Sequence, residues 1–469
     1  MRQRYPGVPG SSHRPTSGHR RWKSSTSSKW TGPASPRRTK RRPSRNGERS
    51  SDSREPDADR PRPDRDRKGT TVASDLILDD RTRAWQTRAR EFARERIRPG
   101  ALEREWIQDP NERMPWDIIE AGSRAGFRTM GVPPRYGGPD PELSPLAAAL
   151  VIEEFAAADP GVASSFNHVV KEIRQIARAG TEEQKEAFFA EFLADDRYLT
   201  GTAMTEPGHG SDRWLQPDGF HFDTTAVRDG EDWVINGRKH CITSGNEAGL
   251  LLVQATTDTS KEYPEATTVF MVRRNTPGLR RGVVHDKLGL RLVNNTEVIF
   301  DNCRVPHSQV LGEVNKGISN VSGFMHDNDL LSLGMKLGIA RAAYETALDH
   351  AKNRVQGNTP IIAHQAVGLK LAEMAAHVEM IRSQMYRLAA MLEGREVFDP
   401  MFMELATWQS VESVFHVATL GVHVCGCRGV WLDHPAQKHL RDALVYFPND
   451  GNHTTHLLVA HRMMMNDCR

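Results

Sequence analysis

The sequence predicts a mostly α-helical protein with a β-domain in its middle. Apolar residues recur at three- and four-residue spacing from Asp75 onward and again from Val321 to the end. Between Tyr198 and about Gly312, short alternating or β-branched runs replace that spacing without intervening helices. We therefore expect an N-terminal α-helical domain over 72–197, a small β-barrel or sandwich over 198–315, and a C-terminal four-helix bundle over 316–469.

Residues 1–71 form a basic tail rich in Pro and Ser, which we expect to be disordered. Residues 1–70 hold 20 Lys and Arg against 7 Asp and Glu, so the tail is near +13 and the remainder near −10. Three interpretations stay open: a transit peptide, a nucleic-acid-binding arm, and translation of a segment upstream of the true start. We expect a cytoplasmic protein, or a mitochondrial matrix protein if the tail is a transit peptide.

Cysteine content and hydropathy exclude several classes. The five cysteines show no framework spacing, which indicates free thiols in a reducing compartment. The pair Cys425 and Cys427 lacks the second pair of ligands that zinc needs, so no metal is predicted. No apolar run approaches the ~20 residues of a membrane span, and the acidic body gives no reason to expect nucleic-acid binding.

The N-terminal helices are predicted from the spacing of apolar residues and from the residues that begin and end helices. An amphipathic helix begins near Ile77 and stops at Pro99-Gly100. Further helices are expected over 116–125, 145–158, 165–179 and 182–194. Asp159-Pro160 is expected to close the helix that begins at residue 145, and Thr181 to cap the last one.

The middle and C-terminal elements are predicted in the same way. Strands are expected over 224–228, 232–235, 250–255, 267–272, 279–284 and 297–300, with a hairpin turn at Asn236-Gly237. Bundle helices are expected over 330–354, 361–392, 400–424, 437–445 and 455–464. The second should bury one face, made of Leu369, Leu371, Met374, Ala375, Val378, Ile381 and Met385.

The stretch Thr205–Asp212, T-E-P-G-H-G-S-D, is the candidate functional loop. Its glycines and proline forbid a helix, which leaves a turn with exposed backbone N–H groups. Two hydroxyls (Thr205, Ser211) and two carboxylates (Glu206, Asp212) surround it. Such a loop can bind a polar planar or phosphorylated ligand, although an ordinary polar loop has the same composition.

Several motifs together resemble the acyl-CoA dehydrogenase family over roughly residues 75–465. The loop resembles the family's T-E-P-G-x-G-S-D, and Ile235 to Gly245 resembles I-N-G-x-K-x-W-I-T-N-G. Further matches are the strand and exit from Gly289 to Pro306, Arg354 with His364-Gln365, Lys438 to Ala443 as K-x-x-R-D-A, and Asp450-Gly451 in place of the usual Glu-Gly. A branch of the family also carries Asp-Gly there.

The resemblance implies FAD bound between the β-domain and the bundle. Thr205 and Ser211 would bond the isoalloxazine, Thr243 and Ile242 would line it, and Cys241 stands where a tryptophan usually covers it. Arg354 would reach the pyrophosphate of a neighbouring subunit's FAD, and Gln365 with the loop 423–427 its adenosine, so a homodimer or homotetramer is implied. The full implied cofactor-binding set is Met204, Thr205, Gly210, Ser211, Cys241, Ile242, Thr243, Arg354, Gln365, His423, Gly426, Cys427, Asn452 and Thr454.

The family's chemistry removes the proton alpha to a thioester while flavin N5 takes the beta hydride. The resemblance makes Asp450 the catalytic base, in a dry site that raises its pKa; a capping role before the last helix is the alternative. The implied substrate contacts are Ser211, Asp329 and Gly451. Asn328 occupies the family's second location for a base, and Asp327 and Asp329 flank it, with Asp329 where arginine is usual.

The resemblance implies an acyl-CoA substrate and an electron-transfer flavoprotein, or a similar acceptor, as partner. Two other functions stay open. A flavin-dependent monooxygenase on the same fold would use reduced flavin and oxygen, and the altered Cys241, Asp329 and His423 leave room for it. A flavin-free binding module is the third class, and it would have little reason to combine Thr205, Ser211, Arg354 and Asp450.

Overall fold

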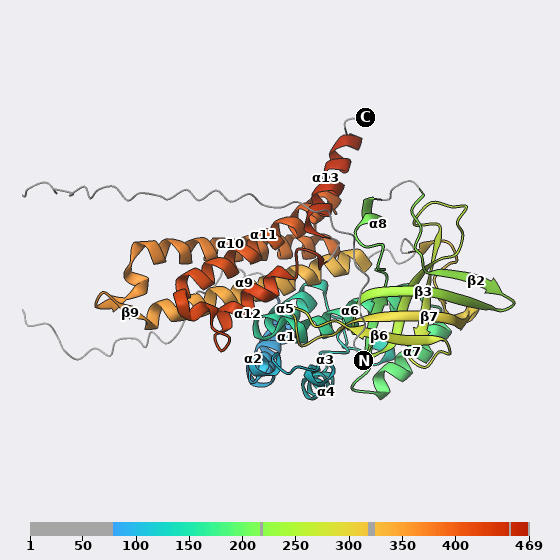
Figure 1. Cartoon of the computed structure of the whole chain (residues 1–469), viewed down its shortest axis with the longest axis horizontal. Helices are drawn as coiled ribbons and strands as arrows, with labels where there is room; N and C mark the ends of the chain where they lie inside the picture. Colours follow the sequence, from blue (N-terminus) through green and yellow to red (C-terminus); the bar gives the residue numbers. More distant parts are fainter. Residues whose placement is uncertain (1–77, 216–218, 318–323, 450–451, 468–469) are drawn as a thin grey trace, which may run out of the picture. The chain divides into compact units, whose positions relative to one another are not determined.

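The computed structural model describes residues 78–215, 219–317, 324–449 and 452–467. The predicted tail over 1–71 and the two residues Asp450 and Gly451 lie outside the described residues. Helices precede and follow a central sheet, which confirms the predicted class (Figure 1). None of the helices in the described ranges is long and apolar enough to cross a bilayer.

The N-terminal helical part begins with a helix of 13 residues, continues through short helical segments and ends on three longer helices of 14, 20 and 13 residues. Its elements are α1 (Asp80–Phe92), η2 (Ala93–Ile97), α2 (Ala101–Arg104), α3 (Pro110–Arg113), α4 (Trp116–Arg124), η3 (Pro134–Tyr136), α5 (Pro145–Ala158), α6 (Pro160–Ala179) and α7 (Glu182–Ala194). At α7 the Thr181 side chain and the Gln184 side chain form a capping box, which confirms the predicted cap.

The boundary between α5 and α6 differs from the prediction. Helix α6 starts at Pro160, five residues before the expected position. The Asp159 carboxylate accepts a hydrogen bond from the Val162 N–H at 2.9 Å, and Pro160 occupies the first helical turn, where its missing N–H costs nothing. Asp159 therefore begins the second helix as well as ending the first.

The β-domain is an eight-stranded sheet with the order β6-β7-β3-β2-β4-β5-β8, and β1 pairs with β4 in parallel. Its strands are β1 (Leu199–Ala203), β2 (Thr225–Asp229), β3 (Asp232–Thr243), β4 (Ala248–Thr256), β5 (Thr267–Arg273), β6 (Leu279–Val284), β7 (Asn295–Pro306) and β8 (Val310–Leu311). The short helix α8 (Asp212–Leu215) follows β1, and η4 (His307–Gln309) precedes β8.

The predicted hairpin at Asn236-Gly237 is wrong. Strand β3 runs straight through these residues, and the turn lies at Gly230, between Asp229 and its partner Asp232. Gly237 has φ of +145° and a register shift against β7 lies beside it. A Cβ there would lie 2.5 Å from Thr224 Cα, so the glycine permits a bulge and a close approach of backbone.

The C-terminal part is built around long helices that lie side by side, and its last helix projects away from them (Figure 1). Its elements are α9 (Phe324–Asn353), β9 (Val355–Gln356), β10 (Thr359–Pro360), η6 (Ile361–Ala363), α10 (Gln365–Leu392), α11 (Pro400–Cys425), η7 (Gly426–Val430), α12 (Pro435–Leu444) and α13 (His453–Asp467). Leu369 does not belong to the predicted buried face: it is 72% exposed, because it lies two residues from the buried Leu371 and so on nearly the opposite face of α10.

One apolar core joins the N-terminal helices to the bundle. It contains residues of α1, α5 and α6 together with residues of α9, α10, α11 and α12. The sheet has its own core, and a third lies where α4, α6 and α7 meet β1, β4 and β5. The bundle and the first helices are therefore one packed body.

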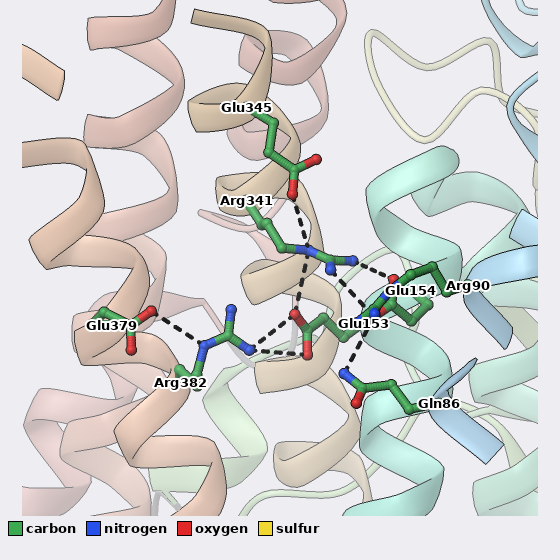
Figure 2. Close-up of polar contacts among 8 residues, drawn as sticks. All are labelled: Gln86, Arg90, Glu153, Glu154, Arg341, Glu345, Glu379 and Arg382. Carbon is green, nitrogen blue, oxygen red and sulfur yellow. Dashed lines mark hydrogen bonds and ion pairs between the residues drawn. The ribbon is translucent and has the colours of Figure 1, made fainter. Parts of the chain in front are cut away.

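A buried ion network crosses this shared core (Figure 2). Glu153 and Glu154 of α5 face two arginines of the bundle. Arg341 of α9 lies 2.7 Å from Glu154, and Arg382 of α10 lies 3.2 Å from Glu153. Burial alone would raise the pKa of Glu154, but Arg341 and Arg90 outweigh it and lower that pKa.

Candidate functional site

The loop that follows β1 is tied directly to strand β3. The His240 N–H donates to the Thr205 carbonyl at 2.7 Å. Met204 is buried and Thr205 is half-buried. The fold thereby brings Met204 and Thr205 next to the segment 241–243, two parts of the predicted cofactor set that lie far apart in the sequence.

Glu206 builds the loop rather than facing a ligand. Its carboxylate accepts hydrogen bonds from Lys239 Nζ at 2.8 Å, the Asp223 N–H at 2.7 Å and the Thr224 N–H at 2.9 Å. Burial would raise the pKa of Glu206, but these donors, with Lys239 first, lower it. The carboxylate is therefore ionised and fully occupied.

Asp212 is occupied in a similar way, which leaves the two hydroxyls as ligand donors. Its oxygens lie 2.9 Å from His209 Nδ1 and 2.6 Å from the Gly210 N–H. The hydrogen bond with Asp212 raises the pKa of His209. Within the described ranges no partner bonds the hydroxyls of Thr205 and Ser211, and both side chains are half-buried. Unpaired hydroxyls with no free carboxylate beside them fit the polar edge of a flavin.

The segment Cys241 to Thr243 is a second bulge in β3. Cys241 is exposed with φ of 56°, and a register shift separates Lys239 from Ile242. Asn295 Nδ2 donates to the Cys241 carbonyl at 2.9 Å and to Thr243 Oγ1 at 3.2 Å. Ile242 packs its side chain into the core of the sheet, so only its backbone is available to a ligand.

The last helix meets the segment that follows the loop. Trp214 of α8 and His456 of α13 have ring centroids 6.5 Å apart, and Arg462 donates to the Leu215 carbonyl. Asn452 Oδ1 accepts the Thr454 N–H at 3.1 Å, so Asn452 caps α13 and Thr454 is exposed. The contact between Trp214 and His456 brings the end of the loop close to the chain just after Asp450. Asp450 and Gly451 themselves lie outside the described residues.

The first turns of α9 hold three polar residues with separate partners. Asp327 pairs with Arg174 at 3.2 Å and with Arg178. Asn328 Oδ1 accepts a hydrogen bond from Lys171 Nζ at 2.7 Å. Asp327 is thus held by two arginines of α6, which fits a structural role better than that of a base.

Asp329 lies on nearly the opposite face of α9 from Asp327. It is near the buried pair of His456 and Glu404, which the sequence analysis missed. Its side chain is 3% exposed, and its charge acts on His456. His456 Nδ1 lies 2.6 Å from Glu404 Oε2 of α11. Lys336 of α9 is also fully buried in this region. Glu404 and Lys336 are charged residues inside apolar helical stretches, and this pattern could have indicated buried ion pairs.

The remaining predicted cofactor residues lie at the far end of the bundle. Helix α9 has 30 residues and so spans about 45 Å, and the β9 hairpin marks its end away from the strands (Figure 1). The residues at this end are exposed, and they are Arg354, Gln365, His423, Gly426 and Cys427. They cannot touch a ligand that is held by Thr205 and Ser211 of the same chain.

The K-x-x-R-D-A stretch has a structural role. Lys438 Nζ lies 2.8 Å from Asp442, 2.9 Å from Asp159 and 3.4 Å from Glu105. The Asp442 carboxylate also accepts the Leu290 N–H at 2.8 Å. The stretch therefore fastens α12 to the N-terminal helices and to the segment between β6 and β7.

Comparisons with known proteins agree with this arrangement. Family models match in order: acyl-CoA dehydrogenase, N-terminal domain, over 79–196; middle domain, over 201–303; and C-terminal domain, over 315–465. An acyl-CoA dehydrogenase of Bacillus subtilis is 31% identical over 378 residues, which is 80% of this chain and 96% of that protein.

Two solved structures show the same fold. The butyryl-CoA dehydrogenase of Megasphaera elsdenii has a TM-score of 0.75 and 28% identity, covering 83% of this chain and 99% of that one. A glutaryl-CoA dehydrogenase of Mycobacterium smegmatis in complex with FADH2 has a TM-score of 0.75 and 25% identity, covering 84% and 97%. From its folded architecture, its loop geometry and these matches, the chain belongs to the acyl-CoA dehydrogenase family of oxidoreductases.

Proposed function

We propose that the chain is an FAD-dependent acyl-CoA dehydrogenase that introduces an α,β double bond into an acyl-CoA thioester. The observation that carries the proposal is the contact between α8 and α13, where Trp214 meets His456. It joins the loop with the free hydroxyls to the segment that carries Asp450. Family membership supports the general reaction.

FAD would be held by the loop and by strand β3. The free hydroxyls of Thr205 and Ser211, the backbone around Gly210, Cys241 and Ile242, and the side chain of Thr243 would hold its ring, with Met204 packed behind the loop. When bound, FAD supplies the acceptor for the beta hydride. Cys241 is a smaller cover than tryptophan, so the ring edge there would be more open to solvent.

Asp450 is the proposed base that takes the alpha proton. Its side chain is one methylene shorter than glutamate, so substrate or backbone would sit about 1.5 Å closer. Ser211, Gly451 and Asp329 would lie around the substrate. The pair of His456 with Glu404, next to Asp329, fixes α13 against α11 and so holds the segment that carries Asp450.

A second copy of the chain would complete each cofactor site. Arg354 presents a fixed fork of N–H donors, which suits a pyrophosphate. Because Arg354, Gln365, His423, Gly426 and Cys427 lie at the far end of the bundle, they would serve the FAD of that second copy. Asn452 and Thr454 would stand near the FAD of their own chain. An electron-transfer flavoprotein is the proposed acceptor of the electrons.

The test is anaerobic titration of the purified full-length chain with saturated acyl-CoAs of several lengths, followed at the flavin absorbance. We expect at least one acyl-CoA to bleach bound FAD. Asp450→Asn should abolish bleaching with FAD still bound, whereas the surface control Asp433→Asn should not. Bleaching that survives Asp450→Asn would overturn the assigned base. A chain that takes up no flavin would overturn the function. An oxidised flavin that no acyl-CoA bleaches, but whose reduced form reacts with oxygen, would favour a monooxygenase.

A further inference from the structure

Four groups of three metal-ligand side chains occur in the part of the chain that the structure describes. In three of these groups, one member already has another role in the structure or in the proposed FAD site. Glu206 holds Lys239, the His434 ring caps α12, and Cys241 lies on the segment proposed to hold FAD. The fourth group lies on the surface of the bundle and consists of Glu373, His377 and His416.

The three side chains of this group converge from two packed helices. Glu373 and His377 are one turn apart on α10, and His416 projects from α11. His416 Nε2 lies 2.8 Å from Glu373 Oε1, and the two imidazole centroids are 4.8 Å apart. One ligand atom from each residue lies within 4.8 Å of the other two. Ligands of tetrahedral zinc are about 3.3 Å apart at bond lengths near 2.0–2.1 Å, so small side-chain rotations would close the site.

A neighbouring hydroxyl prepares the tautomer that a metal needs. His377 Nδ1 lies 2.8 Å from Ser413 Oγ, and Gln409 Nε2 donates to the same oxygen at 2.5 Å. With a proton on Nδ1 donated to Ser413, Nε2 of His377 keeps its lone pair for a metal. Such hydrogen bonds from the second ring nitrogen orient metal-binding histidines.

We propose that Glu373, His377 and His416 form a binding site for a divalent transition-metal ion of the zinc type. Two imidazoles and one carboxylate are a common zinc ligand set. The side chains of His416 and Glu373 are 41% and 51% exposed, which leaves a coordination position for water. The ion would take the place of the proton between His416 Nε2 and Glu373 Oε1, and the neutral imidazole would then carry that proton on Nδ1. Bound metal would also fasten α10 to α11.

The test uses the metal-free full chain, prepared without a histidine tag, titrated with Zn²⁺ by calorimetry. We expect one ion per chain. Co²⁺ should give visible absorption bands, and Zn²⁺ should raise Tm. His416→Gln, His377→Gln and Glu373→Gln should each weaken binding about tenfold or more.

The control variant is His461→Gln, an exposed histidine of α13 outside the group. It should bind Zn²⁺ as the unaltered chain does, and circular dichroism should show that every variant is folded. No binding at millimolar Zn²⁺ would overturn the site. Unchanged affinity in folded His416→Gln and His377→Gln would also overturn it, because the ion would then be bound by histidines elsewhere, such as His13 and His19 of the N-terminal tail.

Discussion

Lys239 Nζ lies 2.8 Å from Glu206 Oε1, and both side chains are completely buried. Lys239 also donates to the Met204 carbonyl at 3.0 Å. The pair therefore fixes the start of the loop to strand β3 beneath the two free hydroxyls. Its function is to hold the shape of the candidate site rather than to contact a ligand.

Lys239→Met should destabilise the protein and weaken FAD binding. It leaves the Glu206 carboxylate buried with only two backbone donors, and breaking such a pair costs about 3–5 kcal/mol. Thermal unfolding and flavin content measure the two effects. Arg238→Met is the control, because the Arg238 side chain is 55% exposed in its pair with Glu297. An equal loss in both variants would contradict the assigned role.

Removal of Arg341 should make the protein less stable at neutral pH and flatten its response to acid. The pKa of Glu154 is lowered in the folded protein, with Arg341 the main favourable charge. This contribution is fully present above the unfolded pKa of about 4.3 and is lost as the pH falls through the folded pKa. We expect Arg341→Met to lower the free energy of unfolding at pH 7 by about 3–5 kcal/mol and so to lower Tm. On acidification the Tm of this variant should fall less than the Tm of the unaltered chain.

The matched control for Arg341 is Arg94→Met. Arg94 pairs with its exposed neighbour Glu95, and their side chains are 69% and 62% exposed. Exposed pairs contribute little, so Tm and its pH dependence should be unchanged. Tm profiles from pH 3 to 7 for both variants give the comparison, and parallel profiles would contradict a role for Arg341.

The pair of His456 and Glu404 should lose stability on the alkaline side. Burial would lower the pKa of His456, but the Glu404 hydrogen bond and the charges of Asp329 and Glu404 raise it, against Lys336. The contribution is present below the unfolded pKa of about 6.5 and is lost as the pH rises through the folded pKa. Tm of the unaltered chain should fall more between pH 6 and 9 than Tm of His456→Gln. His453→Gln, at the neighbouring contact with Glu412, should keep the original profile.

Sharing of the cofactor site between copies predicts that two inactive variants restore activity together. In a mixed dimer of Arg354→Ala with Asp450→Asn, one site combines an intact Asp450 with the partner's intact Arg354, and the other site has neither. Refolded mixtures should therefore recover acyl-CoA-dependent flavin reduction that neither variant shows alone. Mixtures that stay inactive, with dimers present by light scattering, would place Arg354 on the FAD of its own chain.

Local signals predicted the helices well. The bounds of α5 and α7, and the Thr181 cap, depend on residues that are close in sequence, and these were predicted correctly. The Asn236-Gly237 turn failed because Gly237 meets Thr224 and β7, contacts that no short window contains. Leu369 is apolar, but it lies two residues from the buried Leu371 and so on nearly the opposite face of α10, where it is exposed.

The candidate site was predicted as separate pieces. The sequence analysis found Thr205, Ser211 and the segment 241–243. It did not show that the Glu206 carboxylate pairs with Lys239 and is therefore not available to a ligand. The partners of Glu153 and Glu154 were also missed, although two adjacent glutamates in the apolar run of α5 indicated buried counter-charges. Long-range pairing depends on the tertiary fold, so spacing alone could not supply these contacts.

The ion network across the shared core has a consequence for synthesis of the chain. Glu153 and its partner Arg382 are 229 residues apart in the sequence. At about 5–20 residues per second, α5 would leave the ribosome on the order of 10 to 50 s before α10. During that interval two glutamates on an apolar helix face no arginine from the bundle. Nascent N-terminal helices should therefore remain incompletely packed, and dependent on chaperones, until nearly the whole chain has been made.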